Sequence, residues 1–398
     1  MSVETIQVAD PALRPIAEKV LDGTRLGEAD GLTLFRTRDM HGVGRLADFA
    51  RTRLHGDKVF FNRNRHINYT NVCALSCKFC SFYRKRGEDG AYEMPVEQVI
   101  SVAKRAHDAG ATEVHVVGGL HPWLKFDYYL DMLRGIRVAC PELHIKAFTA
   151  IEIIHFSRIA RLSIAEVLVA LREAGLGSLP GGGAEIFDDR VHDEIFKGKV
   201  RADRWFDVHR TAHGLGIYSN ATMLYGHVET VEERVRHLIK LRDLQDESLA
   251  RRDAEINRRK DESDVGDASS LPAFFNALIP LSFIPEGSEL GHLPGPTGLS
   301  DLKTLAITRL MVDNVAHLKA FWIMQGVGLA QLSLGWGCDD LDGTVVWYDI
   351  TKREGHGTTH QELHVDDLKR LIREAGKTPV ERDTLYNEIQ RAPAPLLI

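Results

Sequence analysis

Hydrophobic residues along most of the chain fall into segments that alternate between the spacing of helices and that of strands. After Pro95, apolar residues recur every three or four positions until Gly110, which is typical of an amphipathic helix. Val114, Val116 and Val117 then form a short β-branched run that ends at a glycine pair. Because this helix and strand unit recurs along the chain, the pattern predicts a parallel sheet covered by helices.

The predicted strands and helices together define an α/β fold. Ser163 with Glu166, and Thr230 with Glu233, have the spacing of a capping box and mark two of the helix starts. A further helix is expected from Ser300 through His317. The expected strands are residues 59–69, 114–117, 143–148, 176–179, 217–224, 274–283 and 321–324. This order predicts a (β/α) barrel of the TIM type, partial or complete, in which chemistry lies at the carboxyl ends of the strands.

We expect three parts along the chain: an N-terminal helical segment at residues 1–55, the barrel at residues 56–335, and a C-terminal extension at residues 336–398 packed on the barrel. Residues 244–270 are rich in both charges and poor in large apolar side chains. Such a segment buries too little surface to offset the entropy of ordering, so it is expected to be a disordered insertion.

Composition narrows the class of protein. With 398 residues, of which 44% are hydrophobic, the chain can bury a substantial core. Its 50 basic and 56 acidic residues give a net charge of -6, which argues against nucleic acid as a partner. No uninterrupted apolar run of about 18 residues occurs, and the N-terminus lacks the apolar core of a secretion signal. We therefore expect a cytoplasmic protein with no membrane association.

Five cysteines occur, and Cys73, Cys77 and Cys80 lie close together, with three and then two residues between them. An odd number with one tight group favours a metal site in a reducing compartment over disulfides. Three thiolates on a 4Fe-4S cluster would leave one iron open for a substrate. A structural zinc loop completed by a histidine, or thiols without metal, are the alternatives. The isolated Cys140 and Cys338 are expected to be packing residues.

The spacing of these cysteines, with Phe79 directly before Cys80, resembles the radical SAM superfamily. The resemblance implies that Cys73, Cys77 and Cys80 hold a 4Fe-4S cluster whose open iron binds S-adenosyl-L-methionine (SAM). One electron then cleaves SAM to methionine and a 5'-deoxyadenosyl radical. It also implies a cofactor-binding role for Phe79 and a reducing electron donor such as flavodoxin or ferredoxin.

Several further residues are candidates for binding SAM. Gly118 and Gly119 follow a predicted strand and resemble the glycine motif of the superfamily, whose backbone carbonyls take the methionine amino group. A tight turn would also use such a pair. Glu185, after three successive glycines, could accept hydrogen bonds from a ribose, or could be a carboxylate at the start of a helix near Asp188. Thr149, after the third strand, is a similar candidate.

Two histidines are candidate catalytic residues. His66 lies just before the cysteines and His121 just after the glycine pair, and either could donate to an anionic substrate or move a proton. Since the chain has 18 histidines, each could equally be an ordinary core or surface residue. Arg65 is a further anion-binding candidate, or a solvated surface charge.

Four longer motifs stand at residues 64–73 (NRHINYTNVC), 117–122 (VGGLHP), 146–152 (KAFTAIE) and 179–186 (LPGGGAEI). Together they resemble the aminofutalosine synthase family, which belongs to the futalosine route to menaquinone. The resemblance runs from about residue 55 to the C-terminus. It implies addition of the deoxyadenosyl radical to 3-[(1-carboxyvinyl)oxy]benzoate, a small-molecule substrate with carboxylates, then rearrangement and loss of a carboxyl group to give 6-amino-6-deoxyfutalosine.

Other functions share part of this pattern. The dehypoxanthine futalosine cyclase family has the same cysteine spacing and the same glycine turn, but residues 117–122 and 148–152 favour the synthase. A non-enzymatic iron-sulfur electron carrier is the main alternative from another class, and it would normally supply four thiolates. A zinc-stapled binding protein is a further alternative.

Overall fold

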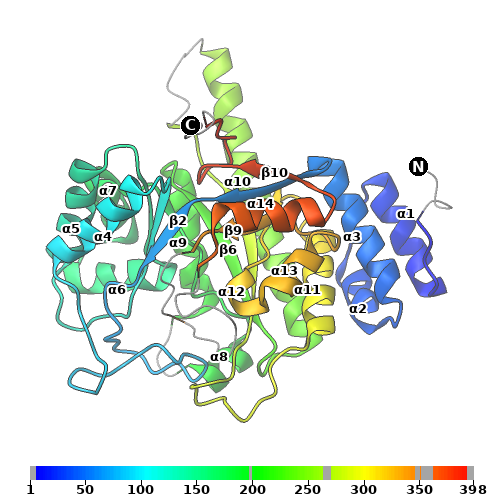
Figure 1. Cartoon of the computed structure of the whole chain (residues 1–398), viewed down its shortest axis with the longest axis horizontal. Helices are drawn as coiled ribbons and strands as arrows, with labels where there is room; N and C mark the ends of the chain where they lie inside the picture. Colours follow the sequence, from blue (N-terminus) through cyan, green and yellow to red (C-terminus); the bar gives the residue numbers. More distant parts are fainter. Residues whose placement is uncertain (1–5, 197–199, 263–269, 346–349, 351–361, 392–398) are drawn as a thin grey trace, which may run out of the picture.

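The computed structural model describes residues 6–196, 200–262, 270–345, 350 and 362–391. Within them the chain forms one seven-stranded and one three-stranded parallel sheet (Figure 1). In the larger sheet the strands follow chain order from β2 to β8. Because every neighbouring pair is parallel, each connection crosses back over the sheet, usually through a helix. The predicted α/β barrel is confirmed in its partial form, since no pairing joins β8 to β2 among these residues.

The strands of the larger sheet are short at its start and longer at β6 and β7. Adjacent strands place His66, His115 and Lys146 in register, so their side chains share one face of the sheet. The strands are β2 (Asn64–Ile67), β3 (Glu113–Val116), β4 (His144–Ala147), β5 (Ser178–Leu179), β6 (Tyr218–Tyr225), β7 (Phe275–Ser282) and β8 (His317–Leu318).

Amphipathic helices cover this sheet. In α4, Val99, Val102, Ala103 and Ala106 are buried at the spacing of one helix face. The capping boxes predicted for α7 and α10 are both present. The helices are α4 (Val96–Asp108), α5 (Phe126–Ala139), α6 (Ala150–Ala160), α7 (Ile164–Ala174), α8 (Asp189–Ile195), α9 (Ala202–Gly214), α10 (Val231–Asp261), α11 (Gly298–Met311), α12 (Trp322–Gln325) and α13 (Val327–Ser333).

The smaller sheet pairs one strand from the N-terminal part of the chain with two strands from its C-terminal part. Strand β1 (Lys58–Asn62) lies between β9 (Asp340–Gly343) and β10 (Thr378–Glu381). Figure 1 shows β10 in red beside the blue N-terminal part. Before β1 come the 3-10 helix η2 (Pro11–Leu13), α1 (Arg14–Asp22), α2 (Glu28–Arg36) and α3 (Met40–His55); α14 (Val365–Glu374) precedes β10. The single strand expected over residues 59–69 is wrong: it is β1 and β2, which belong to different sheets. Both strands are buried and only Arg63 separates them, so no turn residue marks the change from one sheet to the other.

Two other predictions are wrong. Residues 244–261 are not a disordered insertion, because α10 continues to Asp261, while residues 263–269 lie outside the described residues. The amide of Gln245 bonds both backbone groups of Phe275, at 2.8 and 3.1 Å, and so fixes the helix against β7. Likewise, the expected strand at 321–324 is α12, since a short apolar run buried on all sides has no distinctive period.

The helix expected from Ser300 through His317 ends earlier, at Met311, and His317 begins β8. Among the described helices, none combines the length and apolar character that a bilayer span requires.

Candidate active site at the strand ends

The three clustered cysteines lie in a loop after β2 that is bound to the segment following β3. Cys73, Cys77 and Cys80 are all partly exposed. The N–H of Leu120 donates to the sulfur of Cys73 at 3.4 Å, and the N–H of Ala74 donates to the carbonyl of Leu120 at 2.8 Å. The loop therefore has a fixed position at the carboxyl edge of the sheet.

Lys85 holds the same loop through its backbone carbonyls. Its ammonium donates to the carbonyls of Cys73 at 3.0 Å and Leu75 at 2.8 Å, with a longer contact of 3.4 Å to Ala74. It thus gathers three successive carbonyls and adds a positive charge beside the thiols, which suits an anionic ligand set. Sequence reasoning missed Lys85, because a lysine in a loop with other charges carries no distinctive signal.

The donor set fits a 4Fe-4S cluster better than zinc. Within the described ranges, the one group of three or more His, Cys, Asp or Glu side chains whose ligand atoms all lie within 4.8 Å is His55, His317 and Asp339. The three thiols are therefore spread more widely than in a zinc site, where bonds of about 2.3 Å bring sulfurs closer together. Three thiols from one loop match a cluster with one open iron.

The remaining cysteines and Phe79 have packing roles in the structure. Cys140 and Cys338 are fully buried, and burial raises the pKa of the Cys338 thiol to about 12. Both are packing residues, as expected. Phe79 packs edge-on against Phe196, with ring centres 5.3 Å apart. This contact fixes the aromatic side chain next to Cys80.

The glycine pair allows two chain segments to approach closely. A Cβ on Gly118 would lie 2.7 Å from the ring of Tyr69, and one on Gly119 would overlap the carbonyl of Val72. Since Val72 directly precedes the cysteine loop, the end of β3 packs against the backbone that leads into it. A side chain at either position would push the two segments apart.

Glu152 joins three strand ends. Its buried carboxylate accepts from the hydroxyl of Tyr69 at 2.7 Å, the N–H of Gly118 at 3.1 Å and the N–H of Thr149 at 2.7 Å. Burial raises the pKa of Glu152 to about 7, although these hydrogen bonds lower it. Thr149 is the N-cap of α6, in a capping box with Glu152. The spacing of Thr149 and Glu152 was the available signal for this helix start, which the sequence analysis missed.

The triple-glycine turn brings the end of β5 beside Thr149. A Cβ on Gly181 would overlap the carbonyl of Asn220, and one on Gly182 would lie 3.0 Å from the Thr149 side chain. Glu185 is buried and has a φ of 42°, and Phe148 has a φ of 64°. Non-glycine residues in this left-handed region are strained and cluster at functional sites.

Asp188 is the N-cap of α8, as the sequence indicated, so Glu185 precedes that helix and is not in its first turn. Tyr225, which also ends a strand, does not join this group. It is buried and bonded to Ser282 at 2.8 Å and Asp301 at 2.6 Å.

His121 connects two loops beside the glycine pair. Its Nδ1 accepts from the N–H of Trp123 at 3.3 Å and of Leu124 at 3.1 Å, and its Nε2 lies 2.7 Å from a carboxylate oxygen of Glu93. Both ring nitrogens are therefore engaged within the chain. This arrangement suits a residue that shapes the loop.

His66 lies inside the barrel, with its ring centre 4.3 Å from that of His115. Burial lowers the pKa of His66 to about 4, so the ring is neutral at pH 7. Arg65 is adjacent in β2 and faces the other side of the sheet, because side chains alternate along a strand.

A cavity of about 120 Å³ lies inside the barrel, between His66 and the strand ends at Thr149 and Gly182. Two buried ion pairs line it: Lys146 with Glu113 at 2.7 Å, and Lys319 with Asp342 at 2.6 Å. Its other lining residues are His115, Val117, Pro180, Asn220, Thr222, Ile279, Leu281, Phe321 and Ile350. The cavity therefore adjoins the strand ends at Thr149 and Gly182, where the candidate SAM-binding residues lie.

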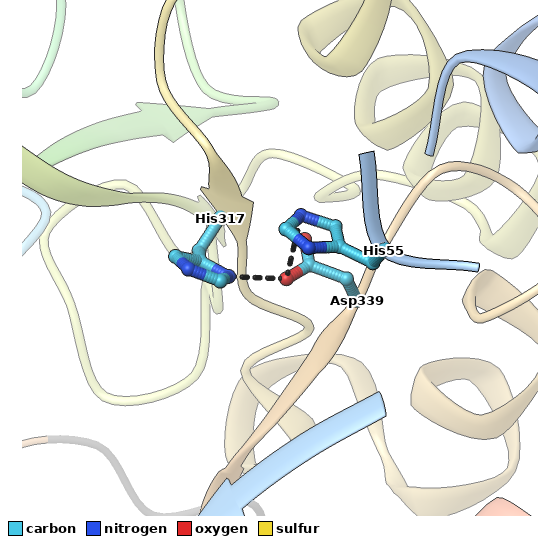
Figure 2. Close-up of side chains that lie close together, drawn as sticks. All are labelled: His55, His317 and Asp339. Atoms are coloured by element: carbon cyan, nitrogen blue, oxygen red, sulfur yellow. Dashed lines mark hydrogen bonds and ion pairs between the residues drawn. The ribbon is translucent and has the colours of Figure 1, made fainter. Parts of the chain in front are cut away.

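A second cluster of titratable groups, shown in Figure 2, lies where α3, β8 and β9 meet. Asp339 is 2.6 Å from Nδ1 of His317 and 3.5 Å from Nε2 of His55, and it also pairs with the buried Arg309. Nε2 of His55 lies 2.7 Å from the carbonyl of Ala316, to which it donates. Because this nitrogen carries a proton and Arg309 already neutralises the carboxylate, the cluster is a structural network and unsuited to a cation.

Comparison with known proteins agrees with this geometry. Residues 67–241 match the radical SAM superfamily, and residues 273–395 match a region described as the CofH/MqnC C-terminal region. The chain is 45% identical over 387 residues to an aminodeoxyfutalosine synthase from Thermus thermophilus, covering 96% of this chain and 97% of that protein. It is 42% identical over 392 residues to one from Streptomyces coelicolor, covering 96% and 95%.

Relatives with other names are less similar. A 5-amino-6-(D-ribitylamino)uracil--L-tyrosine 4-hydroxyphenyl transferase from Methanopyrus kandleri is 35% identical, with 98% of this chain and 99% of that protein covered. A cyclic dehypoxanthine futalosine synthase from Halalkalibacterium halodurans is 32% identical, with 94% of each covered.

Among solved structures, methylornithine synthase superposes with a TM-score of 0.67 over 91% of this chain and 96% of that one. At 18% sequence identity this likeness concerns the fold alone.

Proposed function

Since the chain belongs to the radical SAM superfamily and, within it, to the aminodeoxyfutalosine synthase family, we propose that it joins the 5'-deoxyadenosyl group of SAM to 3-[(1-carboxyvinyl)oxy]benzoate. Methionine is released, one carboxyl group is lost, and the product is 6-amino-6-deoxyfutalosine. The observation that carries this proposal is the identity of 45% and 42% to two such synthases over nearly the whole chain, beside 32 to 35% for relatives with other names. The reaction forms a carbon-carbon bond and belongs to menaquinone biosynthesis.

The cysteine loop would hold the cluster. When bound, the cluster and SAM supply a 5'-deoxyadenosyl radical, and the protein orients that chemistry and excludes water from it. Cys73, Cys77 and Cys80 are the iron ligands in this proposal. Lys85 keeps the loop in one shape through its contacts with the carbonyls of Cys73 and Leu75.

The strand ends would hold SAM. Phe79, Gly118, Gly119, Thr149 and Glu185 are the cofactor-binding residues in this proposal. The support is that the glycine pair lets the end of β3 pack closely against the segment before Cys73, and that Gly182 of the triple-glycine turn lies against Thr149. Glu152 positions this surface, because one carboxylate fixes the ends of β2, β3 and β4.

The two histidines would act differently. His66 lines the cavity as a neutral imidazole at pH 7, which can accept or donate one hydrogen bond to the substrate. For His121, which the sequence marks as a catalytic candidate, we propose an indirect role. Both of its ring nitrogens are engaged within the chain, so it would act by positioning the loop that it shapes. We also propose a cytoplasmic location and a reductant such as flavodoxin or ferredoxin, because the five free thiols require a reducing compartment.

Product analysis tests the proposal. The anaerobically reconstituted enzyme would be reduced with dithionite in the presence of SAM and 3-[(1-carboxyvinyl)oxy]benzoate. The products would be identified by mass spectrometry. The expected result is 6-amino-6-deoxyfutalosine. Formation of 5'-deoxyadenosine alone would contradict the synthase while leaving the superfamily assignment in place. Cyclisation of dehypoxanthine futalosine in a parallel reaction would favour the cyclase.

A further inference from the structure

The barrel cavity contains more buried charge than packing requires. Glu113, Lys146, Lys319 and Asp342 are all nearly inaccessible to solvent, with side-chain exposures of 1%, 3%, 2% and 8%. The interior of a TIM-type barrel is ordinarily filled by branched apolar residues. Since removing ion pairs from water costs free energy that their attraction often fails to offset, these pairs are poorly explained by stability.

Each ammonium group has capacity for another acceptor. An ammonium carries three N–H donors. In the part of the chain that the structure describes, the Lys146 ammonium donates to Glu113 alone, and that of Lys319 to Asp342 alone. Both side chains line the cavity, so their remaining donors can meet a ligand there.

The other walls of the cavity suit an aromatic ring. Val117, Ile279, Leu281 and Phe321 supply apolar surface, while His66 and His115 are kept neutral by burial. The volume of about 120 Å³ is close to that of an engineered cavity of about 150 Å³ that admits benzene. One ring with an acidic substituent therefore matches both the size and the chemistry.

We infer that Lys146 and Lys319 bind the carboxylate of an aromatic acid in this cavity and so determine which substrate enters the barrel. This inference rests on the proposed function only in identifying that acid as the benzoate of the enolpyruvyl substrate. The cavity itself selects a ring of benzoate size that carries a negative charge.

A ligand comparison tests the inference without any substitution. The reconstituted enzyme, loaded with SAM but not reduced, would be titrated in a calorimeter with 3-methoxybenzoate and with the neutral 3-methoxybenzamide. The acid should bind at least about tenfold more tightly than the amide, since hydrogen bonds from charged donors are the stronger ones. Equal affinities, or no binding of the acid, would overturn the inference.

Paired substitutions then assign the residues. Lys146→Met with Glu113→Gln, and Lys319→Met with Asp342→Asn, each remove one ion pair without leaving a buried charge alone. We expect at least one double variant to lose about tenfold or more in affinity for 3-methoxybenzoate. The control is Lys303→Met, whose ammonium donates to the carbonyl of Thr37 outside the cavity, and it should bind the acid like the wild type.

The outcomes separate this inference from the proposed function. If both double variants are folded by circular dichroism and bind the acid as tightly as the wild type, the assignment of Lys146 and Lys319 is wrong even if the adduct forms. If the wild type binds 3-methoxybenzoate in preference to the amide and the double variants do not, but no adduct appears, the synthase proposal fails and the cavity assignment stands.

Discussion

The hydroxyl of Tyr69 lies 2.7 Å from a carboxylate oxygen of Glu152, and this hydrogen bond ties the segment that enters the cysteine loop to the first turn of α6. The same carboxylate also accepts hydrogen bonds from the N–H groups of Gly118 and Thr149. One buried side chain therefore fixes the relative positions of three strand ends that are proposed to hold SAM. Its protonation state should affect how firmly they are joined.

The first prediction concerns the pH dependence of stability. Burial raises the pKa of Glu152 from 4.5 to about 7, so the folded protein binds this proton more tightly than the unfolded chain does. The resulting stabilisation is fully present below about pH 4.5 and is lost as the pH rises through about 7. Relative to the wild type, Glu152→Gln should gain about 3 kcal/mol in free energy of unfolding between about pH 4 and pH 8, measured by urea denaturation.

Glu166 provides the matched control, because it has the same capping-box position in α7 but is exposed. Hydrogen bonds from Ser163 lower its pKa, so Glu166→Gln should not show this gain. A flat difference between wild type and Glu152→Gln across this pH range would contradict the prediction.

The second prediction tests the close approach at the glycine pair. Gly119→Ala places a methyl group against the carbonyl of Val72, directly before Cys73. Displacement of this backbone should destabilise the fold by about 1–3 kcal/mol and lower the iron content after reconstitution. Gly328→Ala is the control, since a Cβ there meets no atom within 4 Å, and its iron content should match the wild type. Unchanged iron in Gly119→Ala would show that the loop tolerates the shift.

The third prediction concerns Lys85. Replacing its ammonium in Lys85→Met leaves the carbonyls of Cys73 and Leu75 without their common donor. The loop should become less ordered, so a chelator such as EDTA should remove the reconstituted cluster several-fold faster than from the wild type. The loss is measured by the decay of the visible absorbance of the cluster. Lys125→Met, on an exposed neighbouring loop, should lose iron at the wild-type rate. Equal rates in all three proteins would show that Lys85 does not support the site.

The sequence was sufficient to predict features that depend on local order. The capping boxes at Ser163 and Thr230 act over three residues, and both are present. Gly118 and Thr149 were expected at strand ends, where they lie, because parallel strands bring those ends to one edge. Contacts between distant residues could not be predicted in this way: Tyr69 and Glu152 are 83 positions apart.

Two wrong predictions, a disordered segment after residue 244 and a single strand over residues 59–69, also arise from contacts between distant residues. Charge and low hydrophobicity suggested disorder after residue 244, but Gln245 bonds the backbone of β7, which folding brings beside it. The split between β1 and β2 depends on a C-terminal strand pairing with β1. In both cases tertiary contacts decided the local structure. Residues that are adjacent in the sequence do not reveal such contacts.

The fourth prediction separates the cysteine ligands from the packing cysteines. Cys73→Ala, Cys77→Ala and Cys80→Ala should each abolish the cluster absorbance and SAM cleavage, because each removes one of three iron ligands. Cys140→Ala should keep both and only lower the melting temperature, since Cys140 is fully buried. Iron analysis with measurement of 5'-deoxyadenosine decides this, and a full cluster in any of the first three variants would contradict the ligand assignment.

The fifth prediction concerns the cluster in Figure 2 and compares two ion pairs of unequal burial. Arg309 and Asp339 are 2% and 0% exposed, whereas Arg25 and Asp313 are 41% and 39% exposed. Asp339→Asn leaves the Arg309 guanidinium buried without a counter-charge and should cost about 3–5 kcal/mol. Asp313→Asn should cost at most about 1 kcal/mol, because water screens the exposed pair. Urea denaturation at pH 7 compares them.

The same variant tests whether the cluster binds a cation. Because Arg309 pairs with Asp339, and His55 donates to a backbone carbonyl, added Zn²⁺ should leave the melting temperature of the cluster-loaded wild type unchanged. A zinc-dependent rise that disappears in Asp339→Asn would instead mean that His55, His317 and Asp339 are metal ligands. Since Nε2 of His55 donates to the carbonyl of Ala316, such a rise would also require this nitrogen to release its proton when the ion binds.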